Sequence, residues 1–439
     1  MVDQPSALQS ESIRGWKEIS RYLGVSQRTA QMWEATQGLP VRRTGGPRGS
    51  VYALKEDLDA WIRQEHAEVG QARHARALQS RRWRTALAGA GAVALAAAAW
   101  LAWHPGGAAA AEIRLEAQAA VGLDEQGRER WRTPLPAPDD RYRADPSRSR
   151  WLRVDLDADA RQEFLVVAAM GRQDLPQMAE VEQHELILLD QEGRVRWART
   201  ASCRVLDAGG NPFNGHWHVH AWTRAKEGRR DRVWLGLGHA LRFPGVVAEL
   251  ATDGTLKPLF VNHGHVNALE VLELNGKKKL LAGGATNALR GGFLAVLDPD
   301  AGLVKAPDGG PPRYRMAMEG GDPEAYLLIP AADLTLASGS DVNYVSWLQA
   351  DGGSGVARAM LGGTACRLYI EFAFPLRPAT ARLSASCEMH HRQYEQQGLL
   401  RHGFDRCPDF RDPLNLQLWT PGQGWTEVQV RLATMQNDL

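Results

Sequence analysis

The hydrophobic positions along the chain follow three different patterns, one after another. Over residues 13–62 apolar residues recur at helical spacing, with short polar and glycine-containing breaks. An uncharged apolar run then covers residues 85–103. Beyond Ile113 the chain consists of short apolar runs separated by Gly, Asp and Asn, which is typical of strands joined by turns. The pattern predicts a small helical module, a hydrophobic segment and a β-rich body.

The N-terminal module is predicted to contain two helices joined by a short turn. Trp16 and Ile19 begin the apolar face of the first helix, and Gly24 ends it. Ser26 is a suitable N-cap for a second helix over residues 27–35, in which Ala30 faces inward. Two short helices with a glycine-containing turn between them form a helix-turn-helix.

A basic hairpin is predicted to follow over residues 41–54. Its tip contains Gly45, Gly46 and Gly49. A third helix is expected from Lys55 onward, with Leu58 on its core face.

This module resembles the MerR/excisionase-type winged helix-turn-helix domain over about 50 residues. The resemblance rests on the run W-K-E-I-S-x-Y-L-G-V-S-x-R-T-A-x-x-W, followed by G-L-P-V, a glycine-rich basic segment and L-D-A-W. It implies that the second helix enters the major groove and that the hairpin contacts backbone phosphates. The DNA-binding residues that it implies are Ser26, Gln27, Arg28, Thr29, Gln31, Arg42, Arg43 and Arg48.

The side chains themselves fit that assignment. Gln27, Arg28 and Gln31 have the planar or forked ends that pair with base edges, and the hairpin arginines suit phosphate. A basic surface that binds another protein is the alternative.

The uncharged run over residues 85–103 is long enough to cross a bilayer as a helix. Nineteen residues at a rise of 1.5 Å give about 28 Å, close to the thickness of a hydrocarbon core. Arg81, Arg82 and Arg84 precede the run, and no Lys or Arg follows it until Arg114. The positive-inside rule therefore places the N-terminus in the cytoplasm. A buried Ala-rich helix or a flexible linker is the alternative.

The β-rich body contains repeated units. Five segments read as a strand, an Asp- or Gly-containing turn and a second strand, namely 121–131, 186–197, 246–256, 294–304 and, more weakly, 345–353. Three further segments read as a strand, a polar loop and an apolar strand, namely 153–168, 222–239 and 271–284. Four strands per repeat predict a β-propeller of five to seven blades, with a β-sandwich pair as the main rival.

An acidic loop in the first of these units offers oxygen donors at alternate positions. Asp155, Asp157, Asp159 and Glu163 occupy positions 1, 3, 5 and 9, a spacing suited to Ca²⁺. The loop resembles those of FG-GAP or VCBS-type propeller repeats, but Ala160 stands where such loops usually have Gly. The alternative is an acidic surface turn whose Asp side chains cap the backbone.

Three alternating histidines form a second candidate. His216, His218 and His220 share one face if the segment is a strand, and imidazoles so placed could bind Zn²⁺ or Cu²⁺ or sense pH. The strand rise separates them by about 7 Å, so one ion would not take all three without a bulge. A solvated His-rich strand face is the more ordinary interpretation.

Charge and cysteine content differ between the N-terminal module and the β-rich body. The chain is 44% hydrophobic and 23% charged, as in globular proteins. Residues 1–84 carry 14 Lys and Arg against 9 Asp and Glu, whereas the remainder is mildly acidic. All four cysteines lie in the body, which suits an oxidising compartment. Local loop length favours a Cys387–Cys407 bridge. No nucleophile elbow, phosphate-binding loop or HExxH motif is present in the sequence.

These features together predict a membrane-anchored DNA-binding transcriptional regulator. The expected organisation is a winged helix-turn-helix domain at 1–66, a basic segment at 67–84, a transmembrane helix at 85–103, a linker at 104–112 and a propeller-like sensor domain at 113–439. The expected partners are double-stranded DNA, the bacterial inner membrane, a periplasmic ligand or protein, and a second copy of the chain. A membrane-tethered propeller enzyme and an adhesion or assembly scaffold are the alternatives, and no catalytic residue is predicted.

Overall fold

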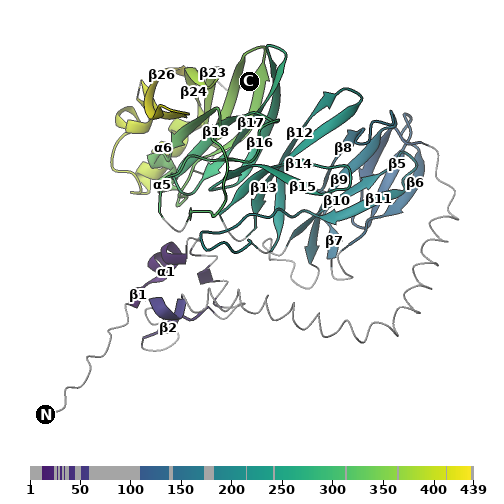
Figure 1. The fold of residues 1–439 in the computed structure, drawn as a ribbon. Helices are drawn as coiled ribbons and strands as arrows, with labels where there is room; N and C mark the ends of the chain where they lie inside the picture. The colour runs from purple at the N-terminus through teal and green to yellow at the C-terminus, as the bar shows by residue number, and fades with distance from the viewer. Residues whose placement is uncertain are drawn as a thin grey trace. The chain divides into compact units, whose positions relative to one another are not determined.

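The computed structural model divides into two compact units, Met1–Pro105 and Gly106–Leu439, which are described separately (Figure 1). The structure describes residues 12–23, 27, 30–31, 34, 39–44, 51–58, 109–137, 142–172, 182–213, 215–240, 243–311, 314–362, 365–411 and 413–436. The predicted transmembrane span at 85–103 lies outside these ranges. Within them, no helix is both long enough and apolar enough to cross a membrane.

The N-terminal unit combines a short helix with a small antiparallel sheet. Helix α1 (Trp16–Leu23) follows β1 (Ser12–Arg14), and the sheet order is β1–β3–β2. Strands β2 (Arg42–Arg43) and β3 (Val51–Leu54) pair antiparallel, as the predicted hairpin requires. Residues 55–58 are helical, and the core side chains of the first and third predicted helices, Ile19 and Leu58, are fully buried.

The second predicted helix is described at four positions, all of them helical. Ala30 is fully buried, as expected for its inward face. Gln27 and Gln31 are exposed and lie four residues apart, so they share a helix face. Ser26, Arg28, Thr29 and Arg48 lie outside the described residues.

The chain is mostly β, and the strands of the C-terminal unit form successive, mainly antiparallel sheets. The first two are β4 (Glu112–Leu115), β5 (Ala119–Leu123), β6 (Glu129–Pro134) and then β7 (Tyr142–Ala144), β8 (Arg150–Val154), β9 (Glu163–Arg172), β10 (Gln183–Leu189), β11 (Val195–Thr200). The third is β12 (Trp217–Glu227), β13 (Arg230–His239), β14 (Gly245–Leu250), β15 (Leu256–Asn262).

Apart from the short β19, the remaining strands form one ten-stranded sheet. It contains β16 (Val266–Leu274), β17 (Lys277–Thr286), β18 (Gly291–Leu297), β20 (Ala325–Pro330), β21 (Tyr344–Asp351), β22 (Ser354–Met360), β23 (Arg367–Ala373), β24 (Arg377–Ser384), β25 (Leu414–Thr420) and β26 (Gly424–Gln436). Its order runs β16–β17–β18–β20–β25–β26–β24–β23–β22–β21, so the β25–β26 hairpin joins two four-stranded meanders.

This arrangement is propeller-like, because four-stranded antiparallel meanders succeed one another with their first strands in contact. β12 packs against β16 (Figure 1), and β16 packs against β21. Four of the five predicted strand–turn–strand segments are hairpins, namely β5–β6, β10–β11, β14–β15 and β21–β22.

The predicted hairpin at 294–304 is wrong. β18 ends at Leu297 and pairs with β20, whereas β19 (Val304–Lys305) pairs in parallel with β15 of the preceding meander. The turn after Leu297 therefore leads the chain away to a neighbouring sheet. A local turn signal cannot distinguish these outcomes, because the partner of the second strand is chosen by long-range packing.

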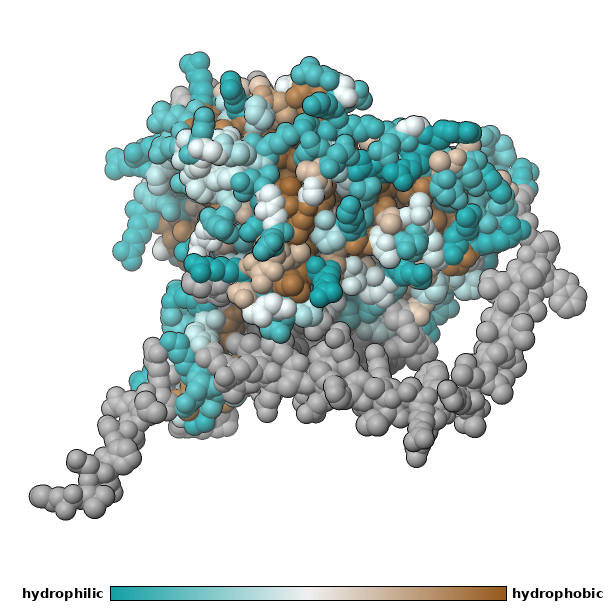
Figure 2. Space-filling view, in the orientation of Figure 1, coloured by the Kyte–Doolittle hydropathy of each residue, from teal (hydrophilic) through white to brown (hydrophobic). Residues whose placement is uncertain are grey.

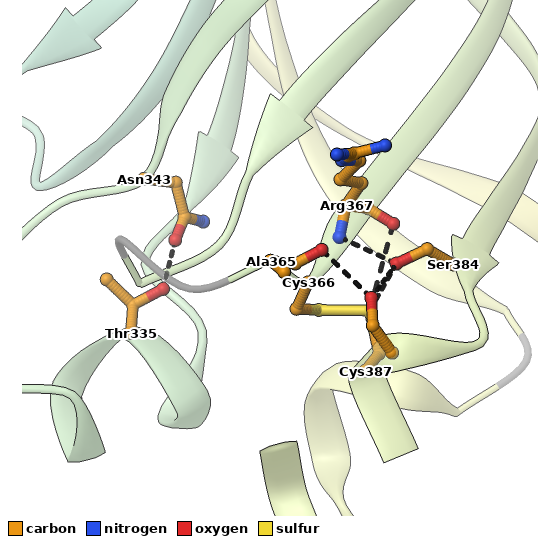
Figure 3. The surroundings of a disulfide bond; sticks show 8 residues. Thr335, Asn343, Ala365, Cys366, Arg367, Ser384 and Cys387 are labelled. Carbon is orange, nitrogen blue, oxygen red and sulfur yellow. Dashed lines mark hydrogen bonds between the residues drawn. A yellow bond between two sulfur atoms is a disulfide. The ribbon is translucent and has the colours of Figure 1, made fainter. Parts of the chain in front are cut away.

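A disulfide in the C-terminal unit joins Cys366 to Cys387, with their Cα atoms 4.4 Å apart. The expected Cys387–Cys407 bridge is therefore wrong. Cys366 immediately precedes β23, and Cys387 lies in the first turn of helix α6 (Ser386–Gln396). The backbone amide of Arg367 donates to the Ser384 hydroxyl and brings these ends together (Figure 3). The fold, and not the length of the loop between the cysteines, therefore determines the disulfide partner of Cys387.

Candidate functional sites

The described DNA-contact candidates lie in the N-terminal unit, where two of them already have acidic partners. Arg42 bonds to Asp57 at 2.7 Å, and Arg43 bonds to Glu34 at 2.6 Å. Both arginine side chains remain at least one-third exposed. The Arg43–Glu34 pair links the hairpin to the helix that carries Gln31, so it fixes their mutual position.

The acidic loop connects β8 to β9 and brings together three of its four predicted ligands. Carboxylate oxygens of Asp155, Asp157 and Asp159 lie within 4.8 Å of one another. Glu163 is outside that group, and its Oε2 accepts a hydrogen bond from the Leu156 amide at 3.2 Å.

The loop makes its tight turns without glycine. Ala158 and Ala160 have φ of 65° and 68°, in the left-handed region that costs residues other than Gly about 1–2 kcal/mol. The carboxylates hold these turns, since Asp155 accepts from the Ala158 amide and Asp159 accepts from the Arg161 amide. These Asp side chains therefore already accept hydrogen bonds from backbone amides of their own loop.

The loop also contacts the next meander through a residue that sequence reasoning missed. Asp231, at the start of β13, accepts a hydrogen bond from the Asp155 amide at 2.8 Å. Lys226 lies 3.1 Å from the same carboxylate and balances its charge. The strand pattern alone carried no signal that this Asp would face the loop.

Burial raises the pKa of Glu163 to about 7, and the charges of Asp157 and Asp159 add to the effect. Protonation of Glu163 near neutral pH is therefore favourable unless a cation compensates the local negative charge.

The alternating histidines belong to a longer row of four imidazoles. His184 on β10 stacks on His218 of β12 with ring centroids 5.0 Å apart, and His220 stacks on His265 at 5.1 Å. His218 and His220 meet edge to face at 6.1 Å and complete the row. His216, the third predicted member, precedes the strand.

Backbone irregularity makes room for this row. The pairing of β12 with β13 shifts register between Val219 and Ala221, so His220 sits on a bulge. Opposite it, a Cβ atom at Gly238 would lie 2.5 Å from His265 Cγ and 2.8 Å from His220 Nε2. A side chain at position 238 would therefore displace the stacked pair.

Most members of the row already have hydrogen-bond partners. The Val219 amide donates to His184 Nδ1 at 3.0 Å, so His184 Nε2 carries a proton and bonds to Glu182 at 2.9 Å. His218 Nε2 donates to the Glu182 carbonyl at 2.9 Å. Among the described residues, the buried Nε2 of His220 has no partner.

Two members of the row have lowered pKa values, which favour their neutral form. Burial lowers the pKa of His218 to about 4 and that of His220 to about 2, and the other imidazoles lower both further. Burial opposes ionisation of Glu182, but the His184 hydrogen bond and the charge of Arg148 keep its pKa below its ordinary value. Neutral imidazoles of this kind suit hydrogen bonding to a ligand better than pH sensing between pH 5 and 8.

On the face of the C-terminal unit shown in Figure 2, hydrophilic side chains predominate and apolar ones show through in narrow strips. Large apolar side chains with more than one-third exposure in the described residues are few: Leu336, Trp347, Met389 and Leu399.

Comparisons with known proteins identify no family. No protein-family model matches the chain, and no curated protein matches it. A GH43 β-xylosidase/α-arabinofuranosidase from a compost microbial metagenome, solved with xylotriose in a calcium-free form, aligns over 55% of this chain and 79% of its own at 13% identity and a TM-score of 0.26. A putative glycosidase from Bacteroides thetaiotaomicron aligns over 56% and 75% at 10% identity and a TM-score of 0.21. Likeness of this size is too distant to bear on substrate or mechanism.

Proposed function

We propose that this protein is a membrane-anchored DNA-binding transcriptional regulator whose β-rich unit binds a ligand or protein partner outside the cytoplasm. The observation that carries the proposal is a helix presenting Gln27 and Gln31 on one exposed face beside a paired basic hairpin. Amide side chains on a helix can pair with adenine edges in the major groove, while neighbouring arginines contact phosphates.

The ion pairs of the hairpin fit this proposal as positioning contacts. Exposed ion pairs are worth about 0.2–1 kcal/mol, so Arg42 and Arg43 can exchange their carboxylates for phosphates at small cost. Glu34 would then lose its partner and disfavour close approach of the phosphate backbone unless Arg43 bridges both.

The topology proposal combines charge, hydropathy and redox chemistry. The arginine cluster before residues 85–103 favours a cytoplasmic N-terminus. The Cys366–Cys387 disulfide favours an oxidising compartment for the body, and the first 105 residues contain no cysteine. We therefore assign a single pass through a bacterial inner membrane, a periplasmic body and regulation by dimerisation, because one helix transmits little except association state.

For the body we propose a propeller of five to seven blades that resembles FG-GAP repeats. Five successive antiparallel units lie in the described residues. We propose that the ligand of this propeller binds at the histidine row. We also propose that the loop at Asp155–Asp159 is a weak Ca²⁺ site. Because those carboxylates already hold backbone amides, the expected affinity is that of extracellular modules, with a Kd of about 10⁻⁴–10⁻³ M.

The DNA-binding proposal is tested with the full chain in detergent, titrated with duplex fragments from the region upstream of its own gene at several salt concentrations. Affinity should fall steeply with salt, and Arg28→Ala with Arg43→Ala should weaken binding and reduce the salt slope by roughly 1 for each arginine–phosphate interaction removed. Arg128→Ala with Arg194→Ala, which removes two exposed arginines of the body, is the charge-matched control. Equal affinity of all three proteins would reject the proposal.

Topology is tested separately with alkaline phosphatase fused after residue 110. Periplasmic activity of the fusion supports the assignment, and a reporter active only in the cytoplasm contradicts it.

The second candidate is a membrane-tethered enzyme, and the Glu182–His184 pair favours it. A carboxylate that orients an imidazole is a common arrangement in general base catalysis. Absence of DNA binding together with an intact, folded body would favour this candidate or a scaffold.

A further inference from the structure

A group of metal-binding side chains lies far along the chain from the histidine row, around helix α6. His391 is on α6, His402 follows it in a loop, and Cys407 lies between the 3-10 turns η3 (Phe404–Arg406) and η4 (Pro408–Phe410). One ligand atom from each of the three lies within 4.8 Å of the others. Ten and four residues separate them in sequence, a spacing that matches no familiar metal motif.

Two of these donor residues are fully buried, and three of the imidazole nitrogens have no hydrogen-bond partner among the described residues. His391 and Cys407 are fully buried. Neither ring nitrogen of His391 has a hydrogen-bond partner in the part of the chain that the structure describes, and the same is true of His402 Nε2. Buried polar atoms are almost always satisfied in folded proteins, so three orphaned nitrogens facing one thiol indicate a missing ligand.

The surroundings favour a cation held by these residues. Asp333, at the start of helix α5 (Asp333–Ala337), places Oδ2 3.8 Å from His402 Nε2. Phe404 and Phe410 pack against the His391 ring with centroids 5.5 Å and 6.2 Å away, which limits access of water from that side.

We propose that His391, His402 and Cys407 bind a Zn²⁺ ion, with Asp333 as the fourth ligand. Two imidazoles, one thiolate and a carboxylate form a donor set that Zn²⁺ accepts in tetrahedral geometry. Bond lengths of about 2.0–2.3 Å place tetrahedral ligands roughly 3.5 Å apart, so His391, His402 and Cys407 need only a small inward movement. Asp333 completes the site by turning toward them from its position beside His402. Cys407 loses its proton on binding.

The ion would hold together a segment that otherwise has few regular contacts. Residues 386–410 lie within the connection between β24 and β25, and α6 contacts α5 and η3. A metal joining α5, α6 and the 402–407 loop fixes this connection against the sheet, as structural zinc sites do.

A free catalytic thiol is the competing interpretation of Cys407, and its environment opposes it. Burial raises the pKa of this thiol to about 11. A nucleophilic cysteine needs the opposite shift.

The test uses the full chain in detergent, stripped of metal with a chelator and without reductant, so that the Cys366–Cys387 bridge persists. Zn²⁺ is added alone, and bound metal is measured by mass spectrometry after desalting. One Zn²⁺ per chain is expected, and Cys407→Ala or His391→Ala should weaken binding by about 100-fold or more. Cys203→Ala, which removes the other buried free cysteine, and His390→Gln should bind as the unaltered chain does.

Two measurements on the unaltered chain remain decisive if the variants do not fold. Co²⁺ should give a thiolate charge-transfer band, and Zn²⁺ should protect Cys407 from alkylation in peptide mapping. A chain that binds no Zn²⁺, a Co²⁺ complex without the thiolate band, or a folded Cys407→Ala chain that keeps its Zn²⁺ would overturn the proposal.

Discussion

The C-terminal unit holds two groups of clustered imidazoles that differ in what their ring nitrogens contact. In the row of four, His184, His218 and His265 each have a ring nitrogen bonded to a carbonyl or carboxylate oxygen. In the group around His391 the described nitrogens face one another and a thiol, without such bonds. The row therefore gives weaker evidence for a metal site than the group around His391, although it contains more histidines. Ring nitrogens that already bond to protein oxygens are not available to an ion.

The largest effect that separates the two groups is thermal stabilisation by Zn²⁺. At about 100 times its Kd, a ligand specific to the folded state adds about 2.7 kcal/mol, which raises the Tm of a unit of this size by several degrees. Calorimetry of the full chain should show this rise, and Cys407→Ala should abolish it. His218→Gln should leave it unchanged. If His218→Gln removes the rise in Tm, the histidine row and not the group around His391 binds the Zn²⁺.

The next effect concerns Glu182, which anchors the row. Its carboxylate bonds to His184 and Arg148, and its side chain is only 5% exposed. Glu182→Gln keeps the size but removes the charge, so we expect a loss of about 2 kcal/mol in urea unfolding. Glu129→Gln breaks an exposed pair with Arg132 and should cost less than about 1 kcal/mol. Equal losses in the two variants would show that the row has no anchored carboxylate.

Acid should destabilise the row through His220. Its pKa is lowered on folding, so between about pH 6.5 and its folded pKa of about 2 the unfolded chain binds more protons. The contribution of His220 to the free energy of unfolding is fully present above pH 6.5 and declines as the pH falls below that value. His220→Leu should remove about 2 kcal/mol of the loss between pH 7 and pH 5, measured by urea unfolding at each pH. His390→Gln should retain the full decline, and an unchanged slope in His220→Leu would contradict the assignment.

The smallest effect extends the comparison to oxygen donors. Ala160→Gly relieves a positive φ of 68° but adds entropy to the unfolded chain, for a net gain in unfolding free energy of about 0.5 kcal/mol.

Millimolar Ca²⁺ should raise the Tm of the unaltered chain less than Zn²⁺ does. Asp157→Asn should remove that increment, and a Ca²⁺ effect larger than the Zn²⁺ effect would show that backbone-bonded carboxylates remain good ligands.

Local signals predicted the hairpins well. Asn275 and Gly276 both have positive φ, as a two-residue turn between β16 and β17 requires, and Asn-Gly favours that conformation. The four-strand repeats were visible for the same reason, since each meander forms from consecutive segments.

Long-range pairing was not predictable in this way. Nothing near Val304 indicates that it pairs with Phe260, and nothing near Cys387 excludes Cys407 as its partner. The cluster around His391 was missed for the same reason, because its donors converge only after α6 and the following loop fold back. By contrast, the acidic spacing from Asp155 to Asp159 marked its loop directly.

The insertion of β25 and β26 into the ten-stranded sheet also sets an order of events during synthesis. These two strands leave the ribosome after β20 and β24, between which they pair. Until they arrive, β20 and β24 each present an unpaired backbone edge, which is a template for association with other chains. A body exported as it is made would meet this hazard outside the cytoplasm, so its maturation would depend on chaperones of that compartment.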